Sequence, residues 1–150
     1  MPFADRLIAR LTRRPPDFVI GGGERPYLRR WYVIPHNRVC NVYLHHFLRS
    51  DDDRALHTHP WANLSILLRG AYREHTPGGG VSDLTAGHWK FRRSGNMAHR
   101  IELTAGPCWT LFVTGPKYQE WGFLCPRGFV HWKEFTAADD EGSVGKGCGD

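Results

Sequence analysis

The sequence predicts an all-β domain, a jelly-roll barrel of about eight short strands preceded by one short helix. Three observations lead to this prediction. From residue 31 onward, short runs rich in β-branched and aromatic residues follow one another at close spacing. Clusters of Gly, Pro, Asn and Asp separate these runs. After residue 15 hardly any segment has helical periodicity, and 150 residues suit one domain with one core.

The first 30 residues are expected to form a helix followed by a basic arm. Residues 2–14 predict a short amphipathic helix, because its apolar residues recur on one face and Pro15-Pro16 follows. That apolar stripe consists of Phe3, Leu7, Ile8 and Leu11. We expect the stripe to pack against the barrel. Contact with a membrane surface or with nucleic acid is the alternative.

Residues 31–136 are expected to form the barrel. The candidate strands span residues 31–34, 41–49, 56–68, 72–75, 87–91, 98–103, 109–114 and 122–124. Three consecutive acidic residues, Asp51, Asp52 and Asp53, predict a turn before the third candidate strand, residues 56–68. Residues 137–150 are acidic and then glycine-rich, which predicts a flexible tail.

Composition places the chain among ordinary globular proteins, with 41% hydrophobic and 23% charged residues. No apolar run approaches the ~20 residues of a membrane span, and the first residues lack the apolar core of a secretory signal. A cytoplasmic location is therefore expected. The net charge of +5 comes mainly from arginines before residue 40, which predict either a solvated basic face or a surface that attracts nucleic acid.

The four cysteines are far apart in the sequence and form no C-x-x-C pair. In a cytoplasmic chain they are expected to stay reduced. Cys40 and Cys108 lie in apolar, strand-like segments and are expected in the core. For Cys125 and Cys148 there is an alternative, in which the two side chains lie close together and form a second small site.

The stretch from residue 57 to residue 70 carries the most specific pattern. Side chains alternate faces along a strand, so His57, His59 and Asn63 are expected on one side. Two imidazoles at positions i and i+2 of a strand can bind one metal ion. His99 is a third candidate, because it shares a face with Ile101 in the alternating segment 98–103.

These two segments, in this order, resemble the two motifs of the cupin superfamily over roughly residues 40 to 115. His57, His59 and His99 match three of the four usual ligand positions, and Gly70 matches the closing glycine of the first motif. Asn63 stands where the family usually has Glu. In the second motif, Gly95 stands four positions before the histidine. The resemblance implies the cupin-type double-stranded β-helix.

A narrower resemblance, to uncharacterised cupin-like proteins of phages and bacteria, covers residues 44–54 and 121–132. It implies no reaction.

The resemblance implies that His57, His59 and His99 bind a divalent transition metal: iron, zinc, nickel or manganese. Without the usual Glu the ligand set is neutral, as in the thiol dioxygenases of the superfamily, so iron is favoured if the protein is an enzyme. A dioxygenase acting on a small organic molecule is the leading hypothesis. A metal- or ligand-binding cupin without turnover and a phage-type nucleic-acid contact are the alternatives.

Four further residues are expected near the metal or a substrate pocket: Asn63, Trp61, His46 and Tyr43. His45 and His46 are adjacent, so one of them faces inward and either could orient a ligand imidazole.

The predicted orientation of these side chains also indicates whether the protein forms oligomers. If His57, His59 and Asn63 point inward, Leu64, Ile66 and Leu68 point outward and need a cover. The N-terminal segment or a second subunit could provide it. A homodimer is expected.

Overall fold

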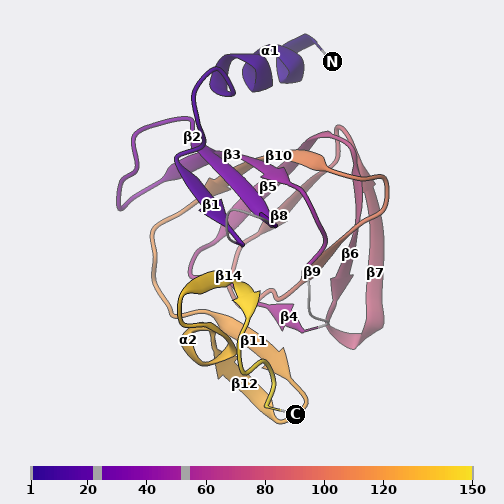
Figure 1. The fold of residues 1–150 in the computed structure, drawn as a ribbon. Coiled ribbons are helices and arrows are strands. Elements are labelled where there is room, and N and C mark those ends of the chain that lie inside the picture. Colours follow the sequence, from indigo (N-terminus) through magenta and orange to yellow (C-terminus); the bar gives the residue numbers. More distant parts are fainter. Residues whose placement is uncertain (1, 22–24, 52–54, 150) are drawn as a thin grey trace.

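The computed structural model describes residues 2–21, 25–51 and 55–149 (Figure 1). Its elements are α1 (Pro2–Leu11), β1 (Phe18–Ile20), β2 (Leu28–Tyr32), β3 (Asn41–Phe47), β4 (Leu56–His57), β5 (Asn63–Arg69), β6 (Ala71–Thr76), a 3-10 turn (Pro77–Gly79), β7 (Gly80–Thr85), β8 (Trp89–Arg92), β9 (Arg100–Leu103), β10 (Cys108–Thr114), β11 (Gly122–Cys125), β12 (Gly128–His131), α2 (Trp132–Phe135), β13 (Thr136–Ala137) and β14 (Asp140–Val144).

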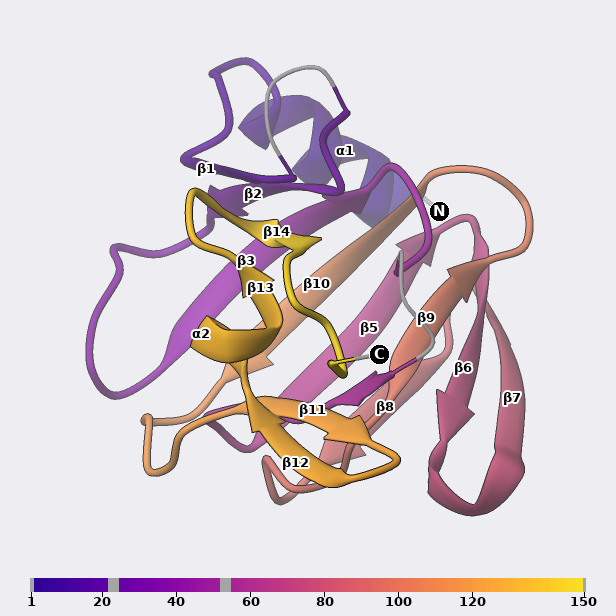
Figure 2. The same ribbon diagram turned by 60° about the horizontal axis from the view of Figure 1, so that its bottom comes forward.

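The strands form antiparallel sheets that wrap around one interior (Figure 2). One sheet has six strands in the order β1-β2-β3-β10-β5-β8, and a second has the order β7-β6-β9. A third, β12-β11-β4, and the small pair β13-β14 complete the described part of the fold. The prediction of an all-β jelly roll with a short N-terminal helix is confirmed.

Strand alternation determines which residues line the interior. In β5 and β10 every second residue is buried, beginning with Asn63 and Cys108 respectively. Between the sheets lies a core cluster that consists of Leu28, Phe47, Leu67, Tyr72, Leu84, Ile101 and Cys108. Asn63 and Leu67 therefore face inward, and the predicted strand phase is correct. The predicted continuous strand 56–68 is interrupted, however, because residues 58–62 form the turn between β4 and β5.

Helix α1 covers part of the outer face of the six-stranded sheet (Figure 1). Ile8 packs with Trp31 and Leu44, and Leu68 is among the half-buried residues around them. The N-terminal segment thus covers one of the three outward aliphatics. Leu64 and Ile66 are half-buried and pair across the sheet with Phe91 and Trp89, which are 58% and 65% exposed. Homodimerisation through this face stays a prediction.

Ile8→Asp is expected to lower the free energy of unfolding by about 2 kcal/mol or more, because it puts a charge into the contact between α1 and the sheet. Urea denaturation measures this change. The control is Phe3→Asp on the same helix, where the side chain is 70% exposed and the expected change is within about 0.5 kcal/mol. Equal stability of the two variants would mean that α1 does not pack on the sheet in solution.

The structure corrects both domain boundaries. The strands β1 and β2 belong to the six-stranded sheet, so the barrel begins before residue 31. The prediction of a flexible tail is wrong, because β14 pairs with β13 and Cys148 is joined to Cys125 of β11. These cysteines are 23 residues apart in the sequence but 5.5 Å apart between Cα atoms. The expectation that all four cysteines stay reduced is therefore wrong as well.

Of the remaining cysteines, Cys108 is buried as expected, whereas Cys40 is exposed in the loop before β3. Among the described residues no helix could span a membrane. The cytoplasmic location stays a prediction.

Candidate metal centre

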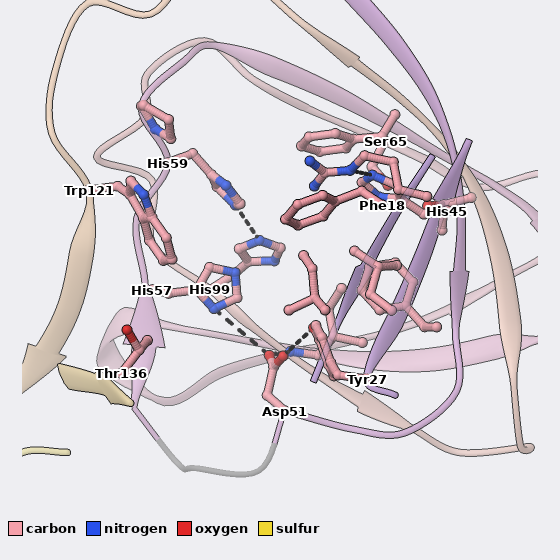
Figure 3. Close-up of a pocket in the computed structure, with 18 of the residues that line it drawn as sticks. Phe18, Tyr27, His45, Asp51, His57, His59, Ser65, His99, Trp121 and Thr136 are labelled. Atoms are coloured by element: carbon pink, nitrogen blue, oxygen red, sulfur yellow. Dashed lines mark hydrogen bonds and ion pairs between the residues drawn. The ribbon is translucent and has the colours of Figure 1, made fainter. Parts of the chain in front are cut away.

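Three histidines converge on one point at the wall of the barrel interior (Figure 3). One ring nitrogen each of His57, His59 and His99 lies within 4.8 Å of the other two. Nε2 of His59 and Nε2 of His99 are 2.8 Å apart. The backbone explains part of this arrangement: His57 and His99 form an antiparallel bridge with N–H···O distances of 2.9 and 3.0 Å, which places their side chains next to each other.

Hydrogen bonds of its backbone N–H and carbonyl fix the position of His59. Its N–H donates to the carbonyl of Gly95 at 2.8 Å, and its carbonyl accepts from Nε2 of Gln119 at 2.8 Å. A Cβ at residue 95 would lie 1.9 Å from the His59 carbonyl oxygen, so this close approach needs glycine. Thr58, which separates His57 from His59 in the sequence, accepts a hydrogen bond at its Oγ1 from the N–H of Gly122 on β11 at 3.0 Å.

A buried ion pair between Glu74 and Arg92 lies beside His99. Glu74 lies opposite Ile101 in the β6–β9 pairing, which brings it diagonally next to His99 on the inner face. One Glu74 oxygen is 2.8 Å from Nδ1 of His99 and also pairs with Arg92. The other is 3.4 Å from Nζ of Lys90. Nη2 of Arg92 is 3.1 Å from the same Nδ1. Because Nδ1 faces the Glu74–Arg92 pair, Nε2 of His99 is directed towards the other two histidines.

A second carboxylate lies beside His57. One Asp51 oxygen is 3.8 Å from Nδ1 of His57 and accepts from the N–H of Ile101 at 2.6 Å. The hydroxyl of Tyr27 donates to the other oxygen. The prediction that Asp51 belongs to a simple turn missed this contact. Asp52 and Asp53 lie outside the described residues.

Burial lowers the pKa of each of the three histidines, most strongly for His59 and His99. After burial, the positive charge of Arg92 is the next cause for His99, and for His57 the charge of Asp51 acts in the opposite direction. All three imidazoles are thus neutral at pH 7, which is the form that binds metal ions.

This donor set fits a divalent transition metal. Three neutral imidazoles present nitrogens to one point, and the second nitrogen of His99 faces the buried Glu74–Arg92 pair. Imidazole suits zinc, copper, iron and nickel alike, so the donor set does not distinguish among them.

The centre faces a cavity of about 370 Å³. Its wall near the histidines is largely aromatic and includes Trp61, Phe112 and Trp121. The rings of Trp61 and His59 are stacked with their centroids 6.0 Å apart. An apolar wall of this kind binds the apolar body of a small molecule and keeps water away from the centre.

Of the four residues predicted near the pocket, Trp61 lines the cavity and Asn63 does not. Asn63 is buried on the inner face, where its Oδ1 accepts from Nη1 of Arg92 at 3.3 Å. Tyr43 also faces inward and stacks on His45, without lining the cavity. His46 is a wrong assignment: it is on the outer face, stacked on Trp109 at 3.9 Å, and its neighbour His45 faces the cavity.

Sequence reasoning missed Glu74, Arg92 and Asp51 as parts of the site. The sequence did contain a pattern that could have indicated Glu74. Tyr72 and Glu74 alternate with Arg73 and His75 along a short strand, so Glu74 is expected on the same face as Tyr72, and both are buried. A carboxylate on an inward face needs a partner, and His99 was an available one. Nothing in the sequence places Arg92 near Glu74, since that contact depends on how two sheets pack.

The fold is a double-stranded β-helix, and its three clustered histidines form a candidate transition-metal site. No family model and no curated protein sequence matches the chain. Solved structures of the same fold do match. A DMSP lyase, DddQ, from Ruegeria pomeroyi DSS-3 has a TM-score of 0.60 and 17% identity, and covers 83% of this chain and 68% of its own.

Two further structures share the fold. An uncharacterised protein with a double-stranded β-helix domain from Klebsiella pneumoniae has a TM-score of 0.53 and 19% identity, covering 70% of this chain and 90% of its own. A putative mannose-6-phosphate isomerase from Ralstonia eutropha has a TM-score of 0.53 and 12% identity, covering 67% of this chain and 92% of its own. At these identities the likeness establishes the fold alone.

Proposed function

We propose that this protein is a metal-dependent enzyme that binds one divalent transition metal through His57, His59 and His99 and oxidises a small organic molecule as a dioxygenase. The observation that carries the proposal is the convergence of three neutral imidazoles, with no carboxylate among the candidate ligand atoms, at the wall of an aromatic cavity. A three-histidine set leaves the ion its full charge of +2 and leaves room for further ligands.

When bound, iron would supply redox chemistry with dioxygen. The other residues of the site surround the metal ligands and bind the substrate. Glu74 and Asp51 place a negative charge 2.8 and 3.8 Å from Nδ1 of His99 and His57, on the side of each ring away from the other histidines. Trp61 and Trp121 bind the apolar part of the substrate and exclude water.

A cupin that binds a metal or a ligand without turnover is the alternative. Oxygen consumption by the iron-loaded protein, measured with candidate small molecules, separates the two functions. A structure of the same fold is described as a DMSP lyase, so loss of the small molecule is followed together with oxygen uptake. Turnover without oxygen uptake would contradict the dioxygenase.

Purified protein is expected to bind about one transition-metal ion per chain, and His57→Ala or His99→Ala should abolish that binding because each removes one of only three ligands. Elemental analysis measures the metal content. His88→Ala is the control, since His88 is exposed and bonds to Thr85 away from the centre. Full metal content in either ligand variant would refute the assignment.

A further inference from the structure

A fourth histidine faces the same cavity without belonging to the metal centre. His45 is buried on the inner face of β3 and lines the cavity (Figure 3). Its ring lies between those of Tyr43 and Phe112, with centroid distances of 5.7 and 5.1 Å. Phe47 contacts it edge-on. The imidazole is therefore held in one orientation by packing.

Arg30 fixes the tautomer of this imidazole. Nε of Arg30 donates to Nε2 of His45 at 2.9 Å. A guanidinium is always protonated and cannot accept, so Nε2 must be the unprotonated nitrogen. Burial and the charge of Arg30 lower the pKa of His45 well below its usual value, so the ring carries one proton, on Nδ1.

Among the described residues the hydrogen bond found for the His45 ring is the one at Nε2, which leaves Nδ1 for a molecule in the cavity that the ring lines. His45 thus presents a fixed N–H donor to whatever occupies the cavity. The hydrogen bond from Arg30 polarises this donor, which strengthens its interaction with an anion.

Thr110 supplies a second donor next to it. It pairs directly with His45 across the β3–β10 ladder, so the two side chains are neighbours on the inner face. Its Oγ1 is buried without a hydrogen-bond partner among the described residues, although Thr110 lines the cavity. A buried hydroxyl without a protein partner is unusual in a folded protein, and this one belongs to a residue of the cavity wall.

We propose that His45 and Thr110 form a binding site for a carboxylate, and that the substrate is a small organic acid with an apolar body. Two donors on one wall suit the two oxygens of a carboxylate. The ring of Phe112 lies against both His45 and His59, at 5.1 and 6.0 Å, so an acid bound at His45 extends along Phe112 towards the metal centre. This assignment deepens the proposed function and rests on it only for the metal end of the substrate.

The test compares two threonines of β10 that both face inward. Both hydroxyls are buried without a hydrogen-bond partner among the described residues, but Thr110 lines the cavity and Thr114 does not. Thr110→Val and Thr114→Val each remove one of them. Benzoate is the probe, with benzyl alcohol as its neutral analogue, and binding is measured by calorimetry on chelator-treated, metal-free protein.

Wild type and Thr114→Val are expected to bind benzoate at least tenfold more tightly than Thr110→Val does, and to prefer it to benzyl alcohol. Thr110→Val should fold with an unchanged or higher Tm, because its hydroxyl has no protein partner to lose. Equal affinity of the two threonine variants, or no binding of benzoate to the wild type, would overturn the proposal.

The tautomer gives an independent readout. In ¹⁵N NMR of the imidazoles, His45 is expected to carry its proton on Nδ1, and benzoate should shift that N–H signal. A proton on Nε2 would overturn the proposal. Because these measurements use metal-free protein, failure of the carboxylate site is distinguishable from failure of the metal site, which the histidine variants and elemental analysis test separately.

Discussion

Glu74→Ala is expected to lower the free energy of unfolding by about 3–5 kcal/mol, because it leaves the buried guanidinium of Arg92 without its counter-ion. Arg92 is 4% exposed, so water cannot replace the lost carboxylate. Asn63 and His99 contact the same guanidinium but carry no negative charge. Urea denaturation measures the loss of stability.

The same substitution is expected to weaken metal binding by about 10- to 100-fold, because it removes the carboxylate beside Nδ1 of His99 and releases the guanidinium that contacts the same nitrogen. Competition with a chelator of known affinity measures this effect. Glu74→Gln preserves the shape of the side chain and separates the loss of charge from the loss of packing.

Glu102→Ala is the matched control for Glu74→Ala. Glu102 lies on the neighbouring strand β9 and bonds to His75 at 2.7 Å, but its side chain is 43% exposed. A surface pair of this kind contributes about 0–1 kcal/mol, and Glu102 has no contact with the three histidines. If Glu74→Ala proved as mild as Glu102→Ala in both assays, the buried carboxylate would have no role in the centre.

Removal of the disulfide between Cys125 and Cys148 is expected to cost about 3 kcal/mol of stability, because the bond restricts the unfolded chain over the 23-residue separation of the two cysteines. The double variant Cys125→Ser/Cys148→Ser should unfold at lower urea concentration than the wild type. It should also be insensitive to a reducing agent, whereas the wild type should be destabilised by one.

The disulfide matters for the cavity as well as for stability. Ser143 and Val144 line the cavity and precede Cys148, so the bond holds a cavity wall in place. Cys40→Ser is the control, because Cys40 is exposed and outside this contact. Identical urea midpoints for the wild type with and without a reducing agent would show that the bond does not form in solution.

The sequence alone was sufficient for the fold class and for the three metal-ligand candidates. Both depend on local regularities: the alternation of strands, the turn residues between them, and the His-x-His spacing that places two imidazoles near each other. Alternation also predicted correctly that Asn63 faces inward and that Leu64 and Ile66 face outward.

Alternation could not determine which of two adjacent histidines faces the cavity. The pattern of β3 is apolar on both faces, since His46 packs on Trp109 while His45 packs on Phe112. Two buried faces remove the polar signal from which strand phase is read, so His46 was chosen wrongly.

Tertiary structure alone decided the partners of the site. Glu74 and Arg92, Asp51 and His57, and Cys125 and Cys148 are brought together by strand pairing and by the packing of different sheets. Their sequence separations follow no fixed period, unlike the spacing of side chains along one strand. A buried charge or a cysteine signals that it needs a partner. Which partner it finds depends on the path of the whole chain.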